Sequence, residues 1–272
     1  MGKTVIRLLL LLFSVLLICS CTEVNQASQP PPEIKIPKEV LQKEAANLLR
    51  IGVSPNYPPV IFIQGGKLAG IEADFARLLP SELNRPVKLV AYRWNDLFRA
   101  LLDGDIDVIM SGVTITRPRQ MRMAFTIPYL KTGLMTAFRL KDADKYTSVK
   151  KILNSNASVG VVANTTGEAY VRKHFKFASR IVLLKNAQEA AWQLKGRNID
   201  LFVHDAPSVM WLVSENESEL TGLWKPLDKE FIAWGVRRGD KRLLDSLNRV
   251  IRKWKKNGTI DKILDNYLPF RS

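Results

Sequence analysis

YRWNDLFRALLDGDIDVIMSGVTITRPRQMRMAFTIPYLKTG, residues 92–133, is the stretch of the sequence that decides the fold. Its first part predicts a helix over Asp96–Leu102, which Gly104 then ends. The segment Asp107–Met110 follows and predicts a short buried strand that stops at Gly112. A helix followed at once by a largely apolar strand is typical of a parallel or mixed sheet covered by helices. We therefore expect an α/β fold.

The same alternation of strands and helices extends in both directions from this stretch. Before it, the pattern predicts strands at Leu48–Val53 and Val87–Ala91, with a helix at Glu72–Leu83 between them. After it, the predicted elements are a strand at 158–162, a helix at 166–175, a strand at 181–184, a helix at 187–195 and a strand at 199–203. No repeat of solenoid period interrupts this order.

The amino-terminal residues have the layout of an export signal. The basic segment Met1–Arg7 precedes the apolar run Leu8–Cys19, which only Ser14 interrupts. A spanning helix needs about 20 apolar residues, and this run is shorter and gives way to polar residues. We therefore predict a cleaved signal peptide over residues 1–20 and a protein located outside the cytoplasm.

The junction LICSC, residues 17–21, resembles a bacterial lipobox, in which Cys21 is the residue that would carry lipid. Cys19 is unusual at the middle position of that motif, so a plain secretory signal remains the alternative. Residues 21–47 contain QASQPPPEIKIP and predict an extended tether, because three consecutive prolines favour polyproline and the segment has little apolar material. A lipid at Cys21 would anchor the protein to a membrane through this tether.

The composition excludes several classes of function. The net charge is +15, with 41 Lys and Arg against 26 Asp and Glu, but the excess is spread along the chain. It is densest at Lys241–Lys256, where apolar residues at helical spacing predict an amphipathic helix with a solvated basic face. We therefore expect no nucleic-acid partner; contact with anionic lipid headgroups is a secondary hypothesis.

Metal and cofactor chemistry also lacks the residues that it needs. The two cysteines both lie at the signal junction, so the mature chain cannot form an intramolecular disulfide or a cysteine-rich metal site. His174 and His204 are the two histidines, and no phosphate-binding or dinucleotide-binding glycine motif is present. We expect neither a metal nor a cofactor.

Five segments of the chain together resemble the family 3 extracellular solute-binding proteins of amino-acid ABC transporters. They follow the family's order and cover nearly all of residues 48–270: LRIGVSPNYPPVIF with GGKLAGIEADFARLL, the stretch 92–133, VGVVANTTGEAYV, IDLFVHDAP and KKNGTIDKILDNYL. The resemblance implies a type II periplasmic-binding fold with two α/β lobes joined by two crossover strands near 131–138 and 230–236. Lobe 1 would comprise 48–132 plus 237–272, and lobe 2 would comprise 134–231.

The resemblance also implies a cleft between the lobes that holds a small amino-acid-like ligand for delivery to an ABC permease. Arg119 matches the family's carboxylate-binding arginine, whose guanidinium can grip both oxygens of a carboxylate. Asp205 matches the aspartate that accepts from the ligand ammonium, and Thr166 matches a lobe 2 residue that helps to hold the carboxylate. Further candidate contacts are Ser111, Gly112 and Thr114, which precede Arg119 at a strand end.

The candidate walls of the cleft are aromatic. Tyr57 and Trp94 match the positions where relatives sandwich the ligand side chain. Ser54 departs from the aspartate of relatives that bind basic or amide side chains, which disfavours lysine or arginine as ligand because a buried cation needs a partner. Val162 and His204 are further candidate contacts, although strand alternation places His204 on the opposite face from Asp205.

Two other functions fit the same fold. Members of the family that resemble cyclohexadienyl dehydratases eliminate water and carboxylate from prephenate or arogenate, which needs a general acid in the cleft. Glu168, at the start of the helix after Thr166, is the candidate acid, with favourable charge at a helix start as its structural role. The remaining hypothesis, ligand capture for a signalling partner, requires a fused membrane-spanning or output domain, and we expect none.

Overall fold

The computed structural model describes residues 47–268, which belong to one compact unit of the chain. The predicted signal peptide, Cys21 and all but the last residue of the predicted tether lie outside the described residues. Within 47–268 no helix combines the length and the apolar character that a membrane crossing requires.

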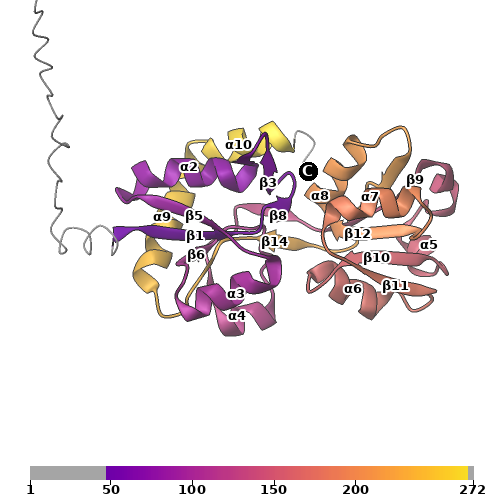
Figure 1. Cartoon of the computed structure of the whole chain (residues 1–272), viewed down its shortest axis with the longest axis horizontal. Coiled ribbons are helices and arrows are strands. Elements are labelled where there is room, and N and C mark those ends of the chain that lie inside the picture. The colour runs from indigo at the N-terminus through magenta and orange to yellow at the C-terminus, as the bar shows by residue number, and fades with distance from the viewer. Residues whose placement is uncertain (1–46, 269–272) are drawn as a thin grey trace, which may run out of the picture. The chain divides into compact units, whose positions relative to one another are not determined.

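Two five-stranded mixed sheets, each covered by helices on both faces, form two lobes (Figure 1). The lobe 1 sheet has the order β5-β1-β6-β15-β7 and the lobe 2 sheet the order β11-β10-β12-β9-β13. The strands of lobe 1 are β1 (Leu49–Val53), β5 (Val87–Ala91), β6 (Val108–Ile109), β7 (Ala124–Phe125) and β15 (Gly235–Val236). Those of lobe 2 are β9 (Leu134–Arg139), β10 (Ser158–Val162), β11 (Arg180–Leu184), β12 (Leu201–Asp205) and β13 (Leu220–Leu223).

In each sheet, the first three strands of the order pair in parallel. β1 pairs in parallel with β5 and β6, while β15 runs antiparallel between β6 and β7. In lobe 2, β10 pairs in parallel with β11 and β12, and β9 runs antiparallel between β12 and β13. The strand β6, Val108–Ile109, lies in the middle of the lobe 1 sheet and is buried, and its burial is what the sequence predicts.

The five helices predicted at 72–83, 96–102, 166–175, 187–195 and 241–256 are present with small shifts at their ends, and within the described residues five short helices that were not predicted accompany them. In lobe 1 they are α2 (Ile71–Leu83), α3 (Trp94–Asp103), α4 (Arg117–Arg122), α9 (Lys241–Lys256) and α10 (Thr259–Tyr267). In lobe 2 they are η1 (Leu140–Lys145), α5 (Val149–Leu153), α6 (Thr166–His174), α7 (Ala187–Lys195) and α8 (Ala206–Ser214). A small sheet on lobe 1 contains β2 (Asn56–Tyr57), β3 (Ile61–Gln64) and β4 (Lys67–Ala69).

Each sheet has an apolar core on both faces. In lobe 1, α2, α9 and α10 cover one face, where Phe75, Trp234 and Trp254 are fully buried, and α3 covers the other. In lobe 2, α7 and α8 cover one face and α6 the other. Burying both faces removes apolar area from water at roughly 25 cal/mol per Å², so each lobe has its own source of stability.

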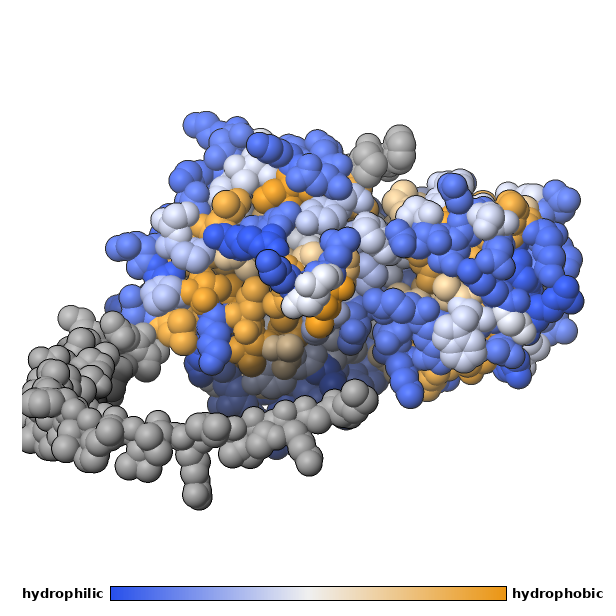
Figure 2. Space-filling model, turned by 45° about the horizontal axis from the view of Figure 1, so that its top comes forward, coloured by the Kyte–Doolittle hydropathy of each residue, from blue (hydrophilic) through white to orange (hydrophobic). Residues whose placement is uncertain are grey.

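Helix α9 explains the dense basic segment near the carboxyl terminus. Leu243, Leu247, Val250, Ile251 and Trp254 are buried in the lobe 1 core, while every Lys and Arg of the helix is exposed. The predicted solvated basic face is therefore confirmed. Figure 2 shows one side of the protein on which hydrophilic residues predominate and smaller hydrophobic areas lie between them.

The chain passes between the lobes on two strands that pair with each other. β8 (Leu130–Thr132) and β14 (Glu230–Ile232) are antiparallel, with Leu130 opposite Ile232. Figure 1 places this pair between the lobes. β15 already belongs to the lobe 1 sheet, two residues before the predicted second part of lobe 1 begins. Two connections that lie side by side restrict relative motion of the lobes mainly to bending at the crossover strands.

Candidate functional site

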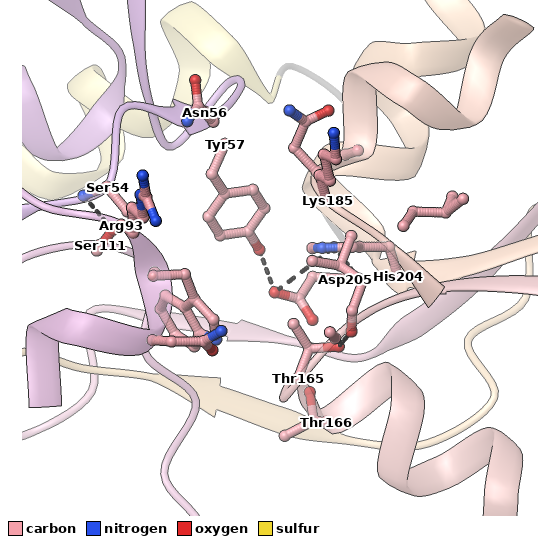
Figure 3. A pocket seen from close by; sticks show the side chains of 18 of the residues that line it. Ser54, Asn56, Tyr57, Arg93, Ser111, Thr165, Thr166, Lys185, His204 and Asp205 are labelled. Atoms are coloured by element: carbon pink, nitrogen blue, oxygen red, sulfur yellow. Dashed lines mark hydrogen bonds and ion pairs between the residues drawn. The ribbon is translucent and has the colours of Figure 1, made fainter. Parts of the chain in front are cut away.

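A cavity of about 720 Å³ lies where residues of the two lobes meet, within the size range of small-molecule sites (Figure 3). All eleven residues predicted to contact a ligand line it: Ser54, Tyr57, Trp94, Ser111, Gly112, Thr114, Arg119, Val162, Thr166, His204 and Asp205. Lobe 1 contributes the first seven and lobe 2 the last four. The structure thus gathers every sequence-predicted candidate in one cavity, although the role of each in binding remains a prediction.

The loop after β6 forms the lobe 1 floor of the cavity. Gly112 has φ of +64°, a conformation that glycine adopts without penalty, and a Cβ at this position would overlap the Tyr57 ring. The Ser54 amide donates to Ser111 Oγ at 2.9 Å, and the Gly112 amide donates to Glu72 Oε2 at 2.8 Å. These bonds hold the loop in place beneath the Tyr57 ring.

Glu72 supports this loop from the buried side of helix α2. Its exposed fraction is 1%, and its Oε1 accepts from the Tyr129 hydroxyl at 2.9 Å. Burial raises the pKa of Glu72 to about 8, even though the bonds from Gly112 and Tyr129 act in the opposite direction. The sequence pattern places Glu72 in a helix but does not show which loop its carboxyl reaches.

Arg119 lies in α4, a short helix that Thr116 caps by accepting from the Arg119 amide. Its guanidinium donates to the Thr114 carbonyl at 2.9 Å and lies 5.4 Å from the ring centroids of both Trp94 and Phe98. Burial lowers the pKa of Arg119, while the nearby Asp205 and Glu230 carboxyls raise it. Within residues 47–268 this guanidinium forms no ion pair, so its other donors are available to a ligand anion.

Asp205 provides the opposite charge from lobe 2. It ends β12, begins the turn into α8 and is buried with an exposed fraction of 6%. The Tyr57 hydroxyl donates a hydrogen bond to Asp205 Oδ2 across the cleft (Figure 3). Burial first, and then the Asp205 charge, raise the pKa of Tyr57 well above its usual value, so the phenol remains a donor near neutral pH.

His204 corrects one expectation from the sequence. Strand alternation predicted that it faces away from the side of Asp205, yet both residues line the cavity. The alternation fails because Asp205 is already the residue before α8, where the chain turns. The Asp205 amide donates to His204 Nδ1 at 2.8 Å, and burial lowers the pKa of His204, so both observations favour the neutral imidazole.

The start of α6 brings two threonines to the cavity with different roles. Thr165 caps the helix by accepting from the Glu168 amide at 3.3 Å, and its hydroxyl donates to the Val162 carbonyl at 2.7 Å. Thr166, the predicted contact, is therefore not the capping residue, and its side chain instead interacts with the Glu230 carboxyl. Both threonines line the cavity, where the partial positive charge of a helix amino terminus favours an anion.

Glu168 does not line the cavity. Its carboxylate accepts from the Asn164 amide at 2.7 Å and from Arg172 Nε at 2.8 Å. Burial raises the pKa of Glu168, but these two bonds lower it by more, so the net shift of the pKa is downward. A carboxyl that is ionised and paired in this way is a poor general acid, which corrects the candidate named from the sequence.

Glu230 does not line the cavity but contacts two residues that do, and sequence reasoning missed it. It lies on the crossover strand β14, where Thr114 of lobe 1 donates to its Oε2 at 3.3 Å, and it also interacts with Thr166 of lobe 2. Burial, followed by repulsion from Asp205 and Asp228, raises its pKa to about 8. No motif marks Glu230, because its importance comes from lying between two segments distant in sequence.

Three contacts between the lobes accompany the bond from Tyr57 to Asp205. Trp94 Nε1 donates to the Asn164 carbonyl at 3.2 Å, and Asn164 Nδ2 donates to Asn95 Oδ1 at 3.0 Å. The rings of Phe62 and Trp211 lie 5.3 Å apart. The two lobes are therefore in direct contact at the rim of the cavity.

Besides Thr165, five further polar residues line the cavity beyond the predicted set. They are Asn56, Arg93, Asn95, Lys185 and Asn186. Arg93 immediately precedes α3, and Lys185 follows β11, so each lies at a boundary between elements where side chains reach a cleft. Within the described residues no group of three or more His, Cys, Asp or Glu side chains could hold a metal ion.

Residues 49–270 match the family model of bacterial extracellular solute-binding proteins, family 3. The chain belongs to this family. A probable histidine-binding protein of Neisseria gonorrhoeae is 29% identical over 74% of this chain and 75% of its own length. A cyclohexadienyl dehydratase of Pseudomonas aeruginosa is 26% identical over 59% of this chain and 60% of its own length.

Solved structures of the family share the architecture of this protein. An ancestral arginine-binding protein bound to arginine is 28% identical and superposes with a TM-score of 0.75 over 82% of this chain and 98% of its own. The two-lobed α/β type II periplasmic-binding fold predicted from the sequence is thereby confirmed.

Proposed function

We propose that this family 3 protein captures an amino acid between its lobes and delivers it to an ABC permease. The observation that carries the proposal is that Arg119 and Asp205, opposite charges from different lobes, line one cavity. An amino acid presents a carboxylate and an ammonium a short distance apart, so it can pair with both. Its binding would replace part of the solvation that each charge loses in the cleft.

The cavity also has the parts that would hold the rest of the head group. Ser111, Gly112 and Thr114 lie on the lobe 1 floor, and Thr166 lies at the start of α6, so hydroxyl groups and a helix amino terminus line the same cavity as Arg119. Ligand bound to both lobes stabilises the closed arrangement, which a permease can distinguish from the open one. The amino-acid-binding relatives of this chain support the same function.

A thermal-shift screen of the purified full-length protein tests this function. The ligands are the standard amino acids, together with versions of the best binder that lack either the carboxylate or the ammonium. We expect stabilisation by at least one amino acid and its loss with both truncated versions, because a ligand stabilises the native state by mass action. No stabilisation by any amino acid would refute the proposal.

The same screen distinguishes transport from catalysis when prephenate and arogenate are included. The dehydratase relative makes the comparison relevant. However, Asp205 is the sole acidic residue among the described residues that line the cavity, and Tyr57 already donates to it. We expect an amino acid to stabilise the protein, and we expect no phenylpyruvate or phenylalanine to form from prephenate or arogenate. Formation of either product would establish the enzymatic function instead.

We further propose that the protein is exported and lipid-anchored at Cys21. The lipobox-like residues 17–21 and the membership in an extracellular family support this proposal. Mass spectrometry of the protein from a bacterial membrane should find a diacylglyceryl group on Cys21. Cys21→Ser should abolish it and Cys19→Ser should not; an unmodified mature terminus would show a plain secretory signal.

A further inference from the structure

Two cationic side chains line the cavity away from the proposed head-group contacts. Arg93 reaches it from lobe 1 and Lys185 from lobe 2. In Figure 3 both lie above the Tyr57 hydroxyl, whereas Thr165 and Thr166 lie below it. Within residues 47–268, neither side chain forms an ion pair with another residue. The two charges therefore face the cavity without a protein anion to balance them.

The charges that line the cavity do not balance. Three lining residues are cationic, Arg93, Arg119 and Lys185, whereas Asp205 is the sole acidic one in the described part of the chain. An amino-acid head group pairs with Arg119 and Asp205, which leaves two cations for the ligand side chain. A cationic ligand side chain would meet like charges and no carboxylate, which is unfavourable in a partly desolvated cleft.

The nearby carboxyls do not compensate Arg93 and Lys185. Glu189 accepts from the backbone amide of Lys185 at 2.9 Å, but it neither lines the cavity nor pairs with the Lys185 ammonium. Glu230 lies against Thr114 and Thr166, on the head-group side. Glu72 is buried beneath Gly112.

The remaining polar wall is neutral. Ser54 is buried, with its amide bonded to Ser111, and Asn56 and Asn186 line the cavity from opposite lobes. Serine and asparagine can donate to an anion as readily as they accept from a cation. This wall therefore accommodates an anionic group and supplies no counter-charge for a cationic one.

We propose that the ligand is an amino acid with an anionic side chain, which Arg93 and Lys185 bind from opposite lobes. This inference rests on the proposed amino-acid-binding function. Glutamate and aspartate are the simplest members of the class. An anion held by both cations links lobe 1 to lobe 2, so the ligand side chain would contribute to closure as well as to specificity.

Calorimetric titration of the full-length protein, purified in a mild detergent, tests the inference. The probes are L-glutamate and L-aspartate, their neutral amides L-glutamine and L-asparagine, and the cationic L-arginine and L-lysine. We expect one acid to bind about tenfold more tightly than its amide, since Arg93 and Lys185 are exposed and each would add one charge-assisted contact. This preference should weaken as salt is added, because exposed charges are screened.

The double variant Arg93→Gln/Lys185→Gln should abolish the preference for the acid over the amide. Its affinity for the acid should fall about tenfold, while its affinity for the amide changes little. Lys88→Gln in lobe 1 and Lys176→Gln in lobe 2 are matched controls, because both side chains are exposed and lie outside the cavity lining. They remove the same charge from each lobe and should leave the preference unchanged.

Three results would overturn the inference, and they separate it from the proposed function. If an amide or a cationic amino acid binds more tightly than either acid, the side-chain assignment is wrong but amino-acid binding stands. If the double variant keeps the preference for the acid, Arg93 and Lys185 are not its cause. If no amino acid binds, the proposed function fails and this inference fails with it.

Discussion

The Tyr57 hydroxyl donates a hydrogen bond to Asp205, and this bond joins lobe 1 to lobe 2 inside the cavity. Asp205 is also the residue proposed to accept from the ligand ammonium. A carboxylate has two oxygens and can accept from both groups, so Tyr57 can orient Asp205 before the ligand arrives. The same bond favours contact between the lobes in the absence of ligand.

Tyr57→Phe should open the ligand-free protein. The variant keeps the ring over Gly112 but loses the bond to Asp205, and hydrogen bonds to charged groups contribute about 1.5–3 kcal/mol. Small-angle X-ray scattering should therefore give a larger radius of gyration without ligand. Tyr267→Phe is the control, because the Tyr267 hydroxyl bonds Asp74 within lobe 1. An equal change of the radius of gyration in both variants would mean that the loss of the bond between Tyr57 and Asp205 does not open the lobes.

Gly112→Ala should damage the site more than an ordinary glycine substitution. Gly112 and Gly65 both have positive φ, at +64° and +55°, so alanine strains the backbone at either position. Only at Gly112 would the new Cβ overlap the Tyr57 ring, since nothing lies within 4 Å at Gly65. We expect Gly112→Ala to weaken ligand binding by about tenfold or more and Gly65→Ala to leave it unchanged. Equal affinities would contradict this packing.

The buried carboxyl of Glu72 should make the free energy of unfolding depend on pH. Its pKa is raised from 4.5 to about 8 by burial, so the folded protein retains a proton that the unfolded chain releases. This carboxyl therefore lowers the free energy of unfolding as pH rises from about 4.5 to about 8, and has no further effect above that range. The slope has a limit of about 1.4 kcal/mol per pH unit.

Glu72→Gln should remove this dependence, because an amide can still accept from Gly112 and can donate to Tyr129. Urea unfolding of the variant and the wild type between pH 5 and pH 8 measures the difference. The stability advantage of the variant should grow as pH rises. Glu217→Gln, at an exposed position, should follow the wild type. A constant difference across the range would show that Glu72 is already ionised in the folded protein.

The strands and helices that the sequence predicted were accessible to prediction because their apolar periodicity is local. Val87–Ala91, Ser158–Val162 and Ala187–Lys195 begin and end where the sequence predicted. The strand predicted at 199–203 instead spans Leu201–Asp205, because β12 pairs with β9 as far as Asp205. Tertiary pairing, which a local pattern does not contain, sets that boundary.

The candidate site was predictable where motifs mark it and unpredictable where the fold alone creates it. Arg119 and Asp205 lie in recognisable segments, and the structure brings them to one cavity. Glu230 had no such signal, because its contacts come from Thr114 and Thr166, both distant in sequence. Arg93 was overlooked beside Trp94, since a basic chain offers many surface arginines and the sequence does not show which one lines a cleft.

The dissociation constant of the best amino-acid ligand, measured by calorimetry for wild type, Arg119→Ala and Asp205→Ala, tests the central claim most directly. Each variant leaves an opposite charge of the ligand without its partner, so we predict a loss of about 2–5 kcal/mol, or roughly 30-fold or more in affinity. The control variants Arg117→Ala and Asp245→Ala, at exposed positions outside the cavity lining, should bind as the wild type does. Unchanged affinity in either Arg119→Ala or Asp205→Ala would contradict the proposed recognition of an amino-acid head group.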